Sequence, residues 1–330
     1  MVAITYPNDE FLAPDAVTEK IDRFARGKFL GFDFCRYVEL KGNESVEWLQ
    51  EVSAPLGDAK ALSALKEITD GGEFPEITFE LYEHKTAVTK MYGLQMTFTR
   101  NIRRNTLLVN MINDGMERAA TWLAKLMNDL IFNSLTNSWS ATASTETNDE
   151  PWNQAAAYVW SDTVNRTPLV DQDGITLKIN DNSYWDNDVD TAYVRKNNFQ
   201  ELQNYLQTTG SVYWTVDPTT GGWNAMLNNV KYIQVSKTSG IPASTALYFR
   251  MGDTPTTCYF KNDMAMEGST GDYTTSPIIN KDGDDIPGKW HVYRYFDDKN
   301  HNAVVQIWFE MYPVTTRKNR KTIGILRTLG

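Results

Sequence analysis

The spacing of apolar residues predicts one helix that is far longer than the average. Between Asn105 and Asn137, apolar side chains recur every three or four residues, the spacing that puts them on one face of a helix. Thr99 or Asn105 can cap its start. At 1.5 Å per residue the helix would be roughly 50 Å long. We therefore expect a helix that crosses an elongated subunit.

We expect the apolar stripe of this helix to pack under strands formed near the C-terminus. Residues 289–296 and 303–312 alternate between apolar and polar positions and predict a β-hairpin. A short strand is expected over 322–329. The core residues expected where helix and hairpin meet are Trp122, Leu123, Leu126, Leu130, Val304, Ile307 and Phe309.

Residues 1–75 contain no element long enough to form a core of its own. We expect a short helix over 15–25, strand-like alternation within 27–40, and helical turns over 45–52 and 58–68. Prolines and glycines interrupt these elements repeatedly. The segment is therefore predicted to be an extended arm that needs another surface to lie on.

Residues 76–98 predict a two-stranded ribbon. Apolar residues alternate with polar ones on both sides of a basic centre. A ribbon alone is marginally stable in water, so it should pack on a neighbour. The apolar residues that we expect to make this contact are Phe79, Leu81, Met91 and Met96.

The middle of the chain combines a polar segment with an α/β region. Residues 138–187 are rich in polar residues, with a strand expected over 174–179. A strand over 191–195 and a helix over 197–207 follow. The loop over 208–228 combines glycines, which permit tight turns, with Trp214 and Trp223, which offer large contact areas.

Composition narrows the class of protein. The chain has 330 residues, 41% of them hydrophobic, and a formal net charge of -10. No apolar run is long enough to span a membrane, and the N-terminus lacks the pattern of a signal peptide, so we expect the chain to stay in the compartment where it is made. Acidic excess argues against a protein that coats nucleic acid. Cys35 and Cys258 are far apart and are expected to be buried thiols, not a disulfide framework.

No motif of catalysis or metal binding is present. His84, His291 and His301 do not stand at metal-ligand spacing with other ligands. Phosphate-binding, dinucleotide-binding and hydrolase-elbow motifs are absent. We therefore expect that the protein is not an enzyme and binds no cofactor or metal. The aromatic content keeps one alternative open, a carbohydrate-active enzyme or carbohydrate-binding module.

Basic residues are concentrated around the ribbon, in Lys85, Lys90, Arg100, Arg103 and Arg104. They could follow a nucleic-acid strand, form a solvated face, or pair with acidic surfaces of identical subunits. We favour pairing between subunits because the chain has an acidic excess. The same interpretation extends to a second basic group in the turn before the last strand, made of Arg317, Lys318, Arg320 and Lys321.

The order of these elements resembles the major capsid protein of tailed double-stranded-DNA viruses, the Hong Kong 97-type fold. FPEITFELYEHKTAVTKMYGLQMTF resembles the E-loop of that family, and the long helix after it resembles the spine helix of the peripheral (P) domain. DTAYVRKNNFQELQNYL resembles the start of the axial (A) domain. The resemblance implies an α+β fold with an N-terminal arm (1–75), E-loop (76–98), P-domain spine helix (99–137), inserted loop or link (138–190), A-domain (191–288) and P-domain closing strands (289–330).

The resemblance implies a structural function. Such a subunit would self-assemble into hexamers and pentamers, forming an icosahedral shell around viral double-stranded DNA without sequence-specific binding. It would form part of a virion assembled in the host cytoplasm, with a portal protein and separate scaffold or decoration proteins as partners and no membrane. The alternative is an encapsulin-type shell that encloses cargo enzymes. Residues expected at contacts between subunits are Phe79, Leu81, Lys85, Lys90, Met91, Met96, Arg100, Arg103, Arg104, Trp214 and Trp223.

Overall fold

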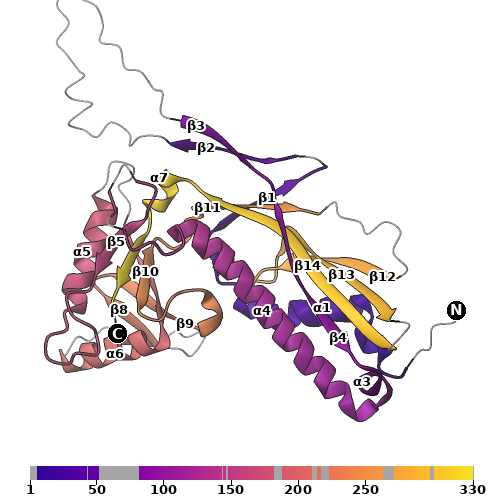
Figure 1. Ribbon diagram of the computed structural model, residues 1–330. Coiled ribbons are helices and arrows are strands. Elements are labelled where there is room, and N and C mark those ends of the chain that lie inside the picture. Colours follow the sequence, from indigo (N-terminus) through magenta and orange to yellow (C-terminus); the bar gives the residue numbers. More distant parts are fainter. Residues whose placement is uncertain are drawn as a thin grey trace, which may run out of the picture.

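The protein is built from two β-sheets, a long helix between them and a projecting two-stranded ribbon (Figure 1). The six-stranded sheet has the order β1-β11-β14-β13-β12, with β4 also paired to β14. The seven-stranded sheet has the order β5-β15-β10-β6-β9-β8-β7. The computed structural model describes residues 6–42, 44–51, 82–142, 144–145, 148–181, 188–209, 214–216, 223–262, 271–297 and 301–329.

The long helix predicted from the sequence is present, and a short turn precedes it. Helix α3 (Arg100–Arg104) and a 3-10 turn (Thr106–Leu108) lead into α4 (Val109–Thr136), which has 28 residues. The Asn105 side chain accepts a hydrogen bond from the Leu107 N–H and so caps the turn. Asn137 ends α4 in the left-handed conformation, with φ of 50°.

Helix α4 packs on the hairpin of β13 (Asp285–Asp297) and β14 (Asn302–Thr315), as predicted. Leu123, Ile307 and Phe309 are buried in this core, and Leu126 and Leu130 pack partly buried at its border. Two predicted core positions are wrong for geometric reasons. The Trp122 side chain is 66% exposed because its place in the helical turn points it away from the sheet. Val304 is buried, but it lies on the other face of β14 from Ile307. The two are three residues apart, and side chains separated by an odd number of residues point to opposite faces of a strand.

The N-terminal segment packs on its own subunit, which corrects the expectation of an arm that needs a neighbour. Helix α1 (Pro14–Ala25) lies against α4 and against β12 (Asp272–Ile279) and β13. Strand β1 (Cys35–Leu40) runs parallel to β11 (Thr256–Lys261). A 3-10 turn over Asp9–Leu12 precedes α1, and two more, over Arg26–Lys28 and Gly31–Phe34, connect α1 to β1. Residues of this segment therefore contribute to the same core as the long helix.

The ribbon is formed by different residues from those expected. Strand β2 (Val46–Glu51) pairs with β3 (Tyr82–Ala87), whereas β4 (Lys90–Phe98) pairs with β14 along its whole length. The helical turn predicted over 45–52 is wrong, because these residues are paired as a strand. The helical turn predicted over 58–68 lies outside the described residues.

The seven-stranded sheet is formed mainly by the α/β region and is covered by two helices. Helix α6 (Lys196–Thr208) follows β6 (Thr191–Arg195) as predicted. Helix α5 (Pro168–Asn180) stands where a strand over 174–179 was expected. The other strands are β5 (Trp152–Ala155), β7 (Trp214–Val216), β8 (Trp223–Leu227), β9 (Val230–Val235), β10 (Thr245–Phe249) and β15 (Gly324–Arg327).

Packing on the sheet explains why residues 174–179 are helical. Ile175 and Ile179 are one helical turn apart, and both are buried. Gly324 of β15 lies directly beneath them, where a Cβ would come within 2.7 Å of both side chains. The Asp171 carboxylate accepts hydrogen bonds from the Ala157 N–H (2.9 Å) and the Trp160 indole (3.2 Å). These contacts hold one face of α5 against the seven-stranded sheet.

Sheet membership does not follow the expected boundary at residue 289. Strands β11 and β12, expected in the A-domain, belong to the six-stranded sheet with β13 and β14. Strand β15, expected among the P-domain strands, pairs with β10 and β5 in the seven-stranded sheet. In the described part of the chain, no helix is long and apolar enough to cross a membrane.

Candidate assembly surface

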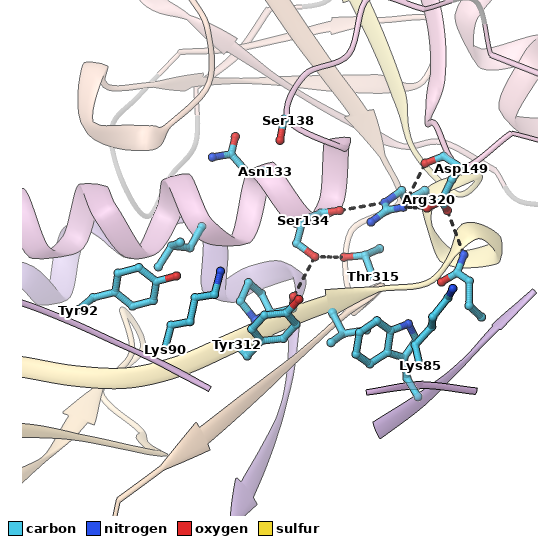
Figure 2. Close-up of a pocket in the computed structure, with 15 residues that line it drawn as sticks. Lys85, Lys90, Tyr92, Asn133, Ser134, Ser138, Asp149, Tyr312, Thr315 and Arg320 are labelled. Atoms are coloured by element: carbon cyan, nitrogen blue, oxygen red, sulfur yellow. Dashed lines mark hydrogen bonds and ion pairs between the residues drawn. The ribbon is translucent and has the colours of Figure 1, made fainter. Parts of the chain in front are cut away.

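A groove lies between the base of the ribbon and the C-terminal half of α4 (Figure 2). Lys85 and Lys90 enter it from β3 and β4, and Asn133 and Ser134 line it from the helix. Aromatic side chains of β2, β4 and β14 complete the wall, namely Trp48, Tyr92 and Tyr312. Two of the basic residues selected from the sequence therefore meet in one concave surface.

The charges in this groove differ in how far they are neutralised. The Lys85 ammonium pairs with the Glu83 carboxylate at 2.7 Å. Within the described part of the chain, the Lys90 ammonium has no ion pair, and the side chain is exposed. Burial raises the pKa of the neighbouring Tyr92 phenol, so this group stays neutral and can donate or accept a hydrogen bond. The groove is therefore suited to receive an acidic group from outside the subunit.

Arg103 is not a surface residue, which corrects its assignment to subunit contacts. Arg103 is 1% exposed, and its guanidinium makes two hydrogen bonds to the Asp9 carboxylate, at 2.7 and 2.8 Å. The rings of Tyr6 and Phe296 lie 4.7 and 4.4 Å from it. A planar cation is well suited to such a site because it can pair with a carboxylate and stack on rings at once. Arg103 therefore ties the N-terminal segment to the start of the long helix.

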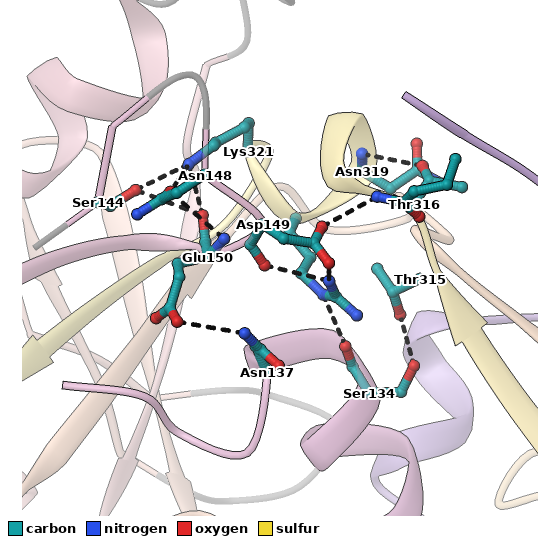
Figure 3. A network of polar contacts seen from close by, with 12 residues as sticks. Ser134, Asn137, Ser144, Asn148, Asp149, Glu150, Thr315, Thr316, Asn319 and Lys321 are labelled. Carbon is teal, nitrogen blue, oxygen red and sulfur yellow. Dashed lines mark hydrogen bonds and ion pairs between the residues drawn. The ribbon is translucent and has the colours of Figure 1, made fainter. Parts of the chain in front are cut away.

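The second basic group is also largely internal. Arg317–Arg320 form the short helix α7, and the Arg320 guanidinium donates to the Ser134 carbonyl (2.9 Å) and pairs with Asp149 (2.7 Å). Lys321 is 0% exposed. Its ammonium lies within 3.0 Å of four oxygen atoms contributed by Ser144, Thr145, Asn148 and Glu150 (Figure 3). The Trp152 ring is 4.7 Å from the same ammonium. Arg320 and Lys321 therefore hold these residues and α4 together, and the expectation that they contact neighbours is wrong.

The remaining predicted contact residues divide into exposed and covered groups. Arg100 and Arg104 are exposed beside the start of α4, and Met91 is 59% exposed. Met96 is partly buried against the core of its own chain, so this part of its side chain does not need a neighbouring copy to cover it. Phe79 and Leu81 lie outside the described residues, as do the side chains of Trp214 and Trp223.

Exposed apolar side chains mark surfaces that the sequence analysis missed. The outer face of the long helix and the turn before it shows Leu107 (85% exposed), Met111 and Trp122. The outer face of α5 shows Val170 and Leu177, which are seven residues apart and so share one stripe. The sequence did contain a signal for these surfaces, because both segments carry apolar residues on more than one helical face, and one face alone can pack on the core.

Two titratable groups of the six-stranded sheet and the helix on it, Asp22 and His291, have shifted pKa values with structural causes. Burial raises the pKa of Asp22 to about 6, and its carboxylate accepts a hydrogen bond from the Trp290 indole at 2.7 Å. Burial, with a smaller effect of Lys289, lowers the pKa of His291 to about 4. Among the described residues, no group of three or more His, Cys, Asp or Glu side chains could hold a metal ion. Asp22 and His291 thus belong to packing contacts of the six-stranded sheet, with α1 and within β13 respectively.

Comparison with solved structures finds a similar fold in two capsid structures and a further phage structure. The chain aligns with the capsid of cyanophage A-1(L) with a TM-score of 0.56 at 14% identity, covering 92% of this chain and 93% of that chain. A structure from Microbacterium phage Oxtober96 gives a TM-score of 0.52 at 9% identity over 90% of each chain. The capsid of a native GTA particle gives 0.51 at 12% identity, over 92% and 91%. No protein-family model and no curated protein matches the sequence.

These alignments extend over nearly the whole chain. The chain therefore has the α+β Hong Kong 97-type capsid fold that the order of its sequence elements predicted. At identities of 14% and below, the likeness is one of architecture.

Proposed function

We propose that this protein is a major capsid protein whose copies self-assemble into the icosahedral shell of a tailed virus. The observation that carries this proposal is the agreement of fold, over nine-tenths of the chain, with the capsid of a cyanophage and the capsid of a native GTA particle. In this role the protein is a structural component and not a catalyst, and it resides in the virion.

The family architecture assigns a role to each part of the structure. We assign the six-stranded sheet and α4 to the P-domain, and the seven-stranded sheet with α5 and α6 to the A-domain. We assign the ribbon of β2 and β3 to the base of the E-loop, replacing the earlier limits of 76–98. The ribbon then reaches across an adjacent subunit of the same ring.

Surface composition supports contact between copies. Leu49, Tyr82 and Val88 on or beside the ribbon are 57%, 57% and 71% exposed. Exposed apolar groups that gather on one projection are typical of an interaction site. Obligate interfaces bury about 2,000 to 5,000 Å² or more, which requires such surfaces on several sides of the subunit. The exposed faces of α4 and α5 supply further area.

In the finer proposal, hexamers and pentamers form the shell, and it encloses viral double-stranded DNA. Lys90, Arg100 and Arg104 are exposed cations in a chain with a net charge of -10, so acidic surfaces of identical copies are available to them. A portal protein and separate scaffold or decoration proteins complete the particle, which assembles in the host cytoplasm. An acidic shell suits enclosed DNA because it does not grip the phosphates.

Electron microscopy of particles formed by the full chain tests this proposal. Expression in bacteria should give closed icosahedral shells with five-fold and six-fold rings, and particles purified from infected cells should contain double-stranded DNA. Shells filled with an enzyme would favour the encapsulin-type alternative. A chain that stays monomeric at high concentration, with or without a co-expressed scaffold, would contradict the proposal.

A further inference from the structure

Two cysteines that are 223 positions apart in the sequence meet in the core beside the edge of the six-stranded sheet. Cys35 begins β1, and Cys258 lies in the adjacent parallel strand β11. Their sulfur atoms are 2.8 Å apart, and both side chains are buried as free thiols. A disulfide bond is about 2.05 Å long, so the sulfurs need to approach by less than about 1 Å.

The surroundings of the pair leave the thiols without another role. The Cys35 thiol has one further hydrogen-bond contact, with the Gly31 carbonyl at 3.5 Å. Both side chains otherwise belong to the hydrophobic core formed with α1 and α4. No metal-ligating group of three residues is found near them in the described part of the chain. The contact between the two sulfurs is therefore the chemically distinctive feature of this site.

We propose that Cys35 and Cys258 are an oxidisable pair that closes an intramolecular disulfide when the subunit meets a low-molecular-weight disulfide such as oxidised glutathione. In the first step the thiolate of one cysteine attacks the glutathione disulfide, forms a mixed disulfide and releases one glutathione thiolate. The second cysteine thiolate then attacks the protein-bound sulfur and releases the second glutathione. Two thiols lose two protons and two electrons, and the glutathione disulfide is reduced to two thiols.

Access to the pair depends on the position of β1. Burial raises the pKa of the Cys35 thiol, so little thiolate forms while the site is closed. Strand β1 is an edge strand whose pairing, among the described residues, is with β11 alone. Separation of β1, or folding before β1 docks, exposes the thiols. We therefore expect slow oxidation of the folded subunit and fast oxidation during refolding.

The bond would link the N-terminal segment covalently to the sheet that it covers. Helix α1 packs against α4 and against β12 and β13, and β1 follows as the edge strand of the six-stranded sheet. A covalent link across such a long loop restricts the unfolded chain more than the folded one. Oxidation is therefore expected to hold this segment in place, whether or not the protein forms a shell.

Thiol trapping with intact mass measurement tests the inference. The full chain is refolded with oxidised glutathione or with a reducing phosphine, and then alkylated under denaturing conditions. The oxidised sample should lack alkylation and be lighter than the reduced, unalkylated chain by two hydrogen atoms, with one linked peptide containing both cysteines. Cys35→Ala and Cys258→Ala should each retain one thiol that is alkylated or carries one glutathione. Two free thiols in the oxidised wild type, or bonds only between chains, would overturn the inference.

A second measurement tests the effect on the N-terminal segment. The oxidised chain should unfold several degrees above the reduced chain, since the loop closed by the bond is long. The Cys35→Ala/Cys258→Ala variant should unfold at the same temperature with and without oxidant. Equal unfolding temperatures for oxidised and reduced wild type would refute the restriction of this segment.

Discussion

The N-terminal segment and the ribbon are neighbours in the sequence but are packed in opposite ways. In the N-terminal segment Leu12, Val17 and Ile21 are 0% exposed. In the ribbon, which follows almost directly, Leu49 and Tyr82 are each 57% exposed. Both segments looked like arms that need an external surface. The difference shows that a short element is covered by its own subunit when its apolar residues match an available face.

Buried polar groups reinforce the contrast between the two segments. The Asn128 side chain of α4 donates to the Lys28 carbonyl (2.7 Å) and accepts from the Gly31 N–H (2.8 Å). The Asn8 amide donates to two carbonyls beside α3, at 2.7 and 2.8 Å. In the ribbon, by comparison, His84 and Lys85 pair with exposed glutamates of the ribbon itself. Hydrogen bonds to α3 and α4 thus distinguish the N-terminal segment from the ribbon.

Removing the Arg103 anchor should have the largest effect on the folded subunit. Arg103→Ala leaves the buried Asp9 carboxylate without its partner, which typically costs about 3 to 5 kcal/mol. Equilibrium unfolding of the purified subunit in urea measures this change. Arg104→Ala is the matched control, because Arg104 is exposed and should change the free energy of unfolding by less than about 0.5 kcal/mol. Similar losses in both variants would contradict the buried anchor.

Substitution of two adjacent residues of α4 compares the buried face of the helix with its exposed face. Leu123→Ala removes a side chain that is 1% exposed and should cost about 2 to 5 kcal/mol through lost burial and a residual cavity. Trp122→Ala should change the free energy of unfolding by less than about 0.5 kcal/mol, because its side chain is 66% exposed. Thermal and urea unfolding of the two variants compare them directly. A larger loss for Trp122→Ala would reverse the assignment of the two faces.

The ribbon should affect assembly without affecting the fold. Leu49→Glu and Val88→Glu place charges on side chains that are 57% and 71% exposed, so unfolding of the isolated subunit should be nearly unchanged. Shell yield, measured by sedimentation and electron microscopy, should fall sharply because the charges would be buried against a neighbour. A double variant that forms normal shells would show that the ribbon is not a contact between copies.

Patterns that lie within one element could be read from the sequence, whereas pairings between distant elements could not. The long helix was predicted because its apolar stripe repeats over many turns, but the width of that stripe concealed the exposed position of Trp122. Alternation of Ile175, Leu177 and Ile179 suggested a strand, although Gly324 provides the space for a helix. Arg103 looked like its basic neighbours, because its partner Asp9 lies 94 residues away.

Asp22 provides the prediction with the smallest expected effect, and it tests the packing of the N-terminal segment specifically. This carboxylate lies on α1 and accepts a hydrogen bond from the Trp290 indole of β13, so it joins the N-terminal segment to the sheet. Burial raises the pKa of Asp22 from 3.8 to about 6, against the opposing effects of hydrogen bonds from Trp290 and Ser276. Between these pH values the folded chain binds the proton more strongly than the unfolded chain does. The contribution of Asp22 to stability is therefore full below about pH 4 and is lost as pH rises through 6.

Asp22→Asn should abolish this pH dependence while keeping an acceptor for the indole. His291 must be separated from it, because its pKa is lowered to about 4 and its contribution is present above pH 6.5 and lost as pH falls through 4. The two effects oppose each other in the same range, so the informative quantity is the difference between wild type and variant. Urea unfolding from pH 4 to 8 should show the variant gaining stability relative to wild type, with most of the gain between pH 4 and 6 and little further change above pH 6. A constant difference across this range would mean that Asp22 is ionised in the folded subunit and that α1 does not bury it.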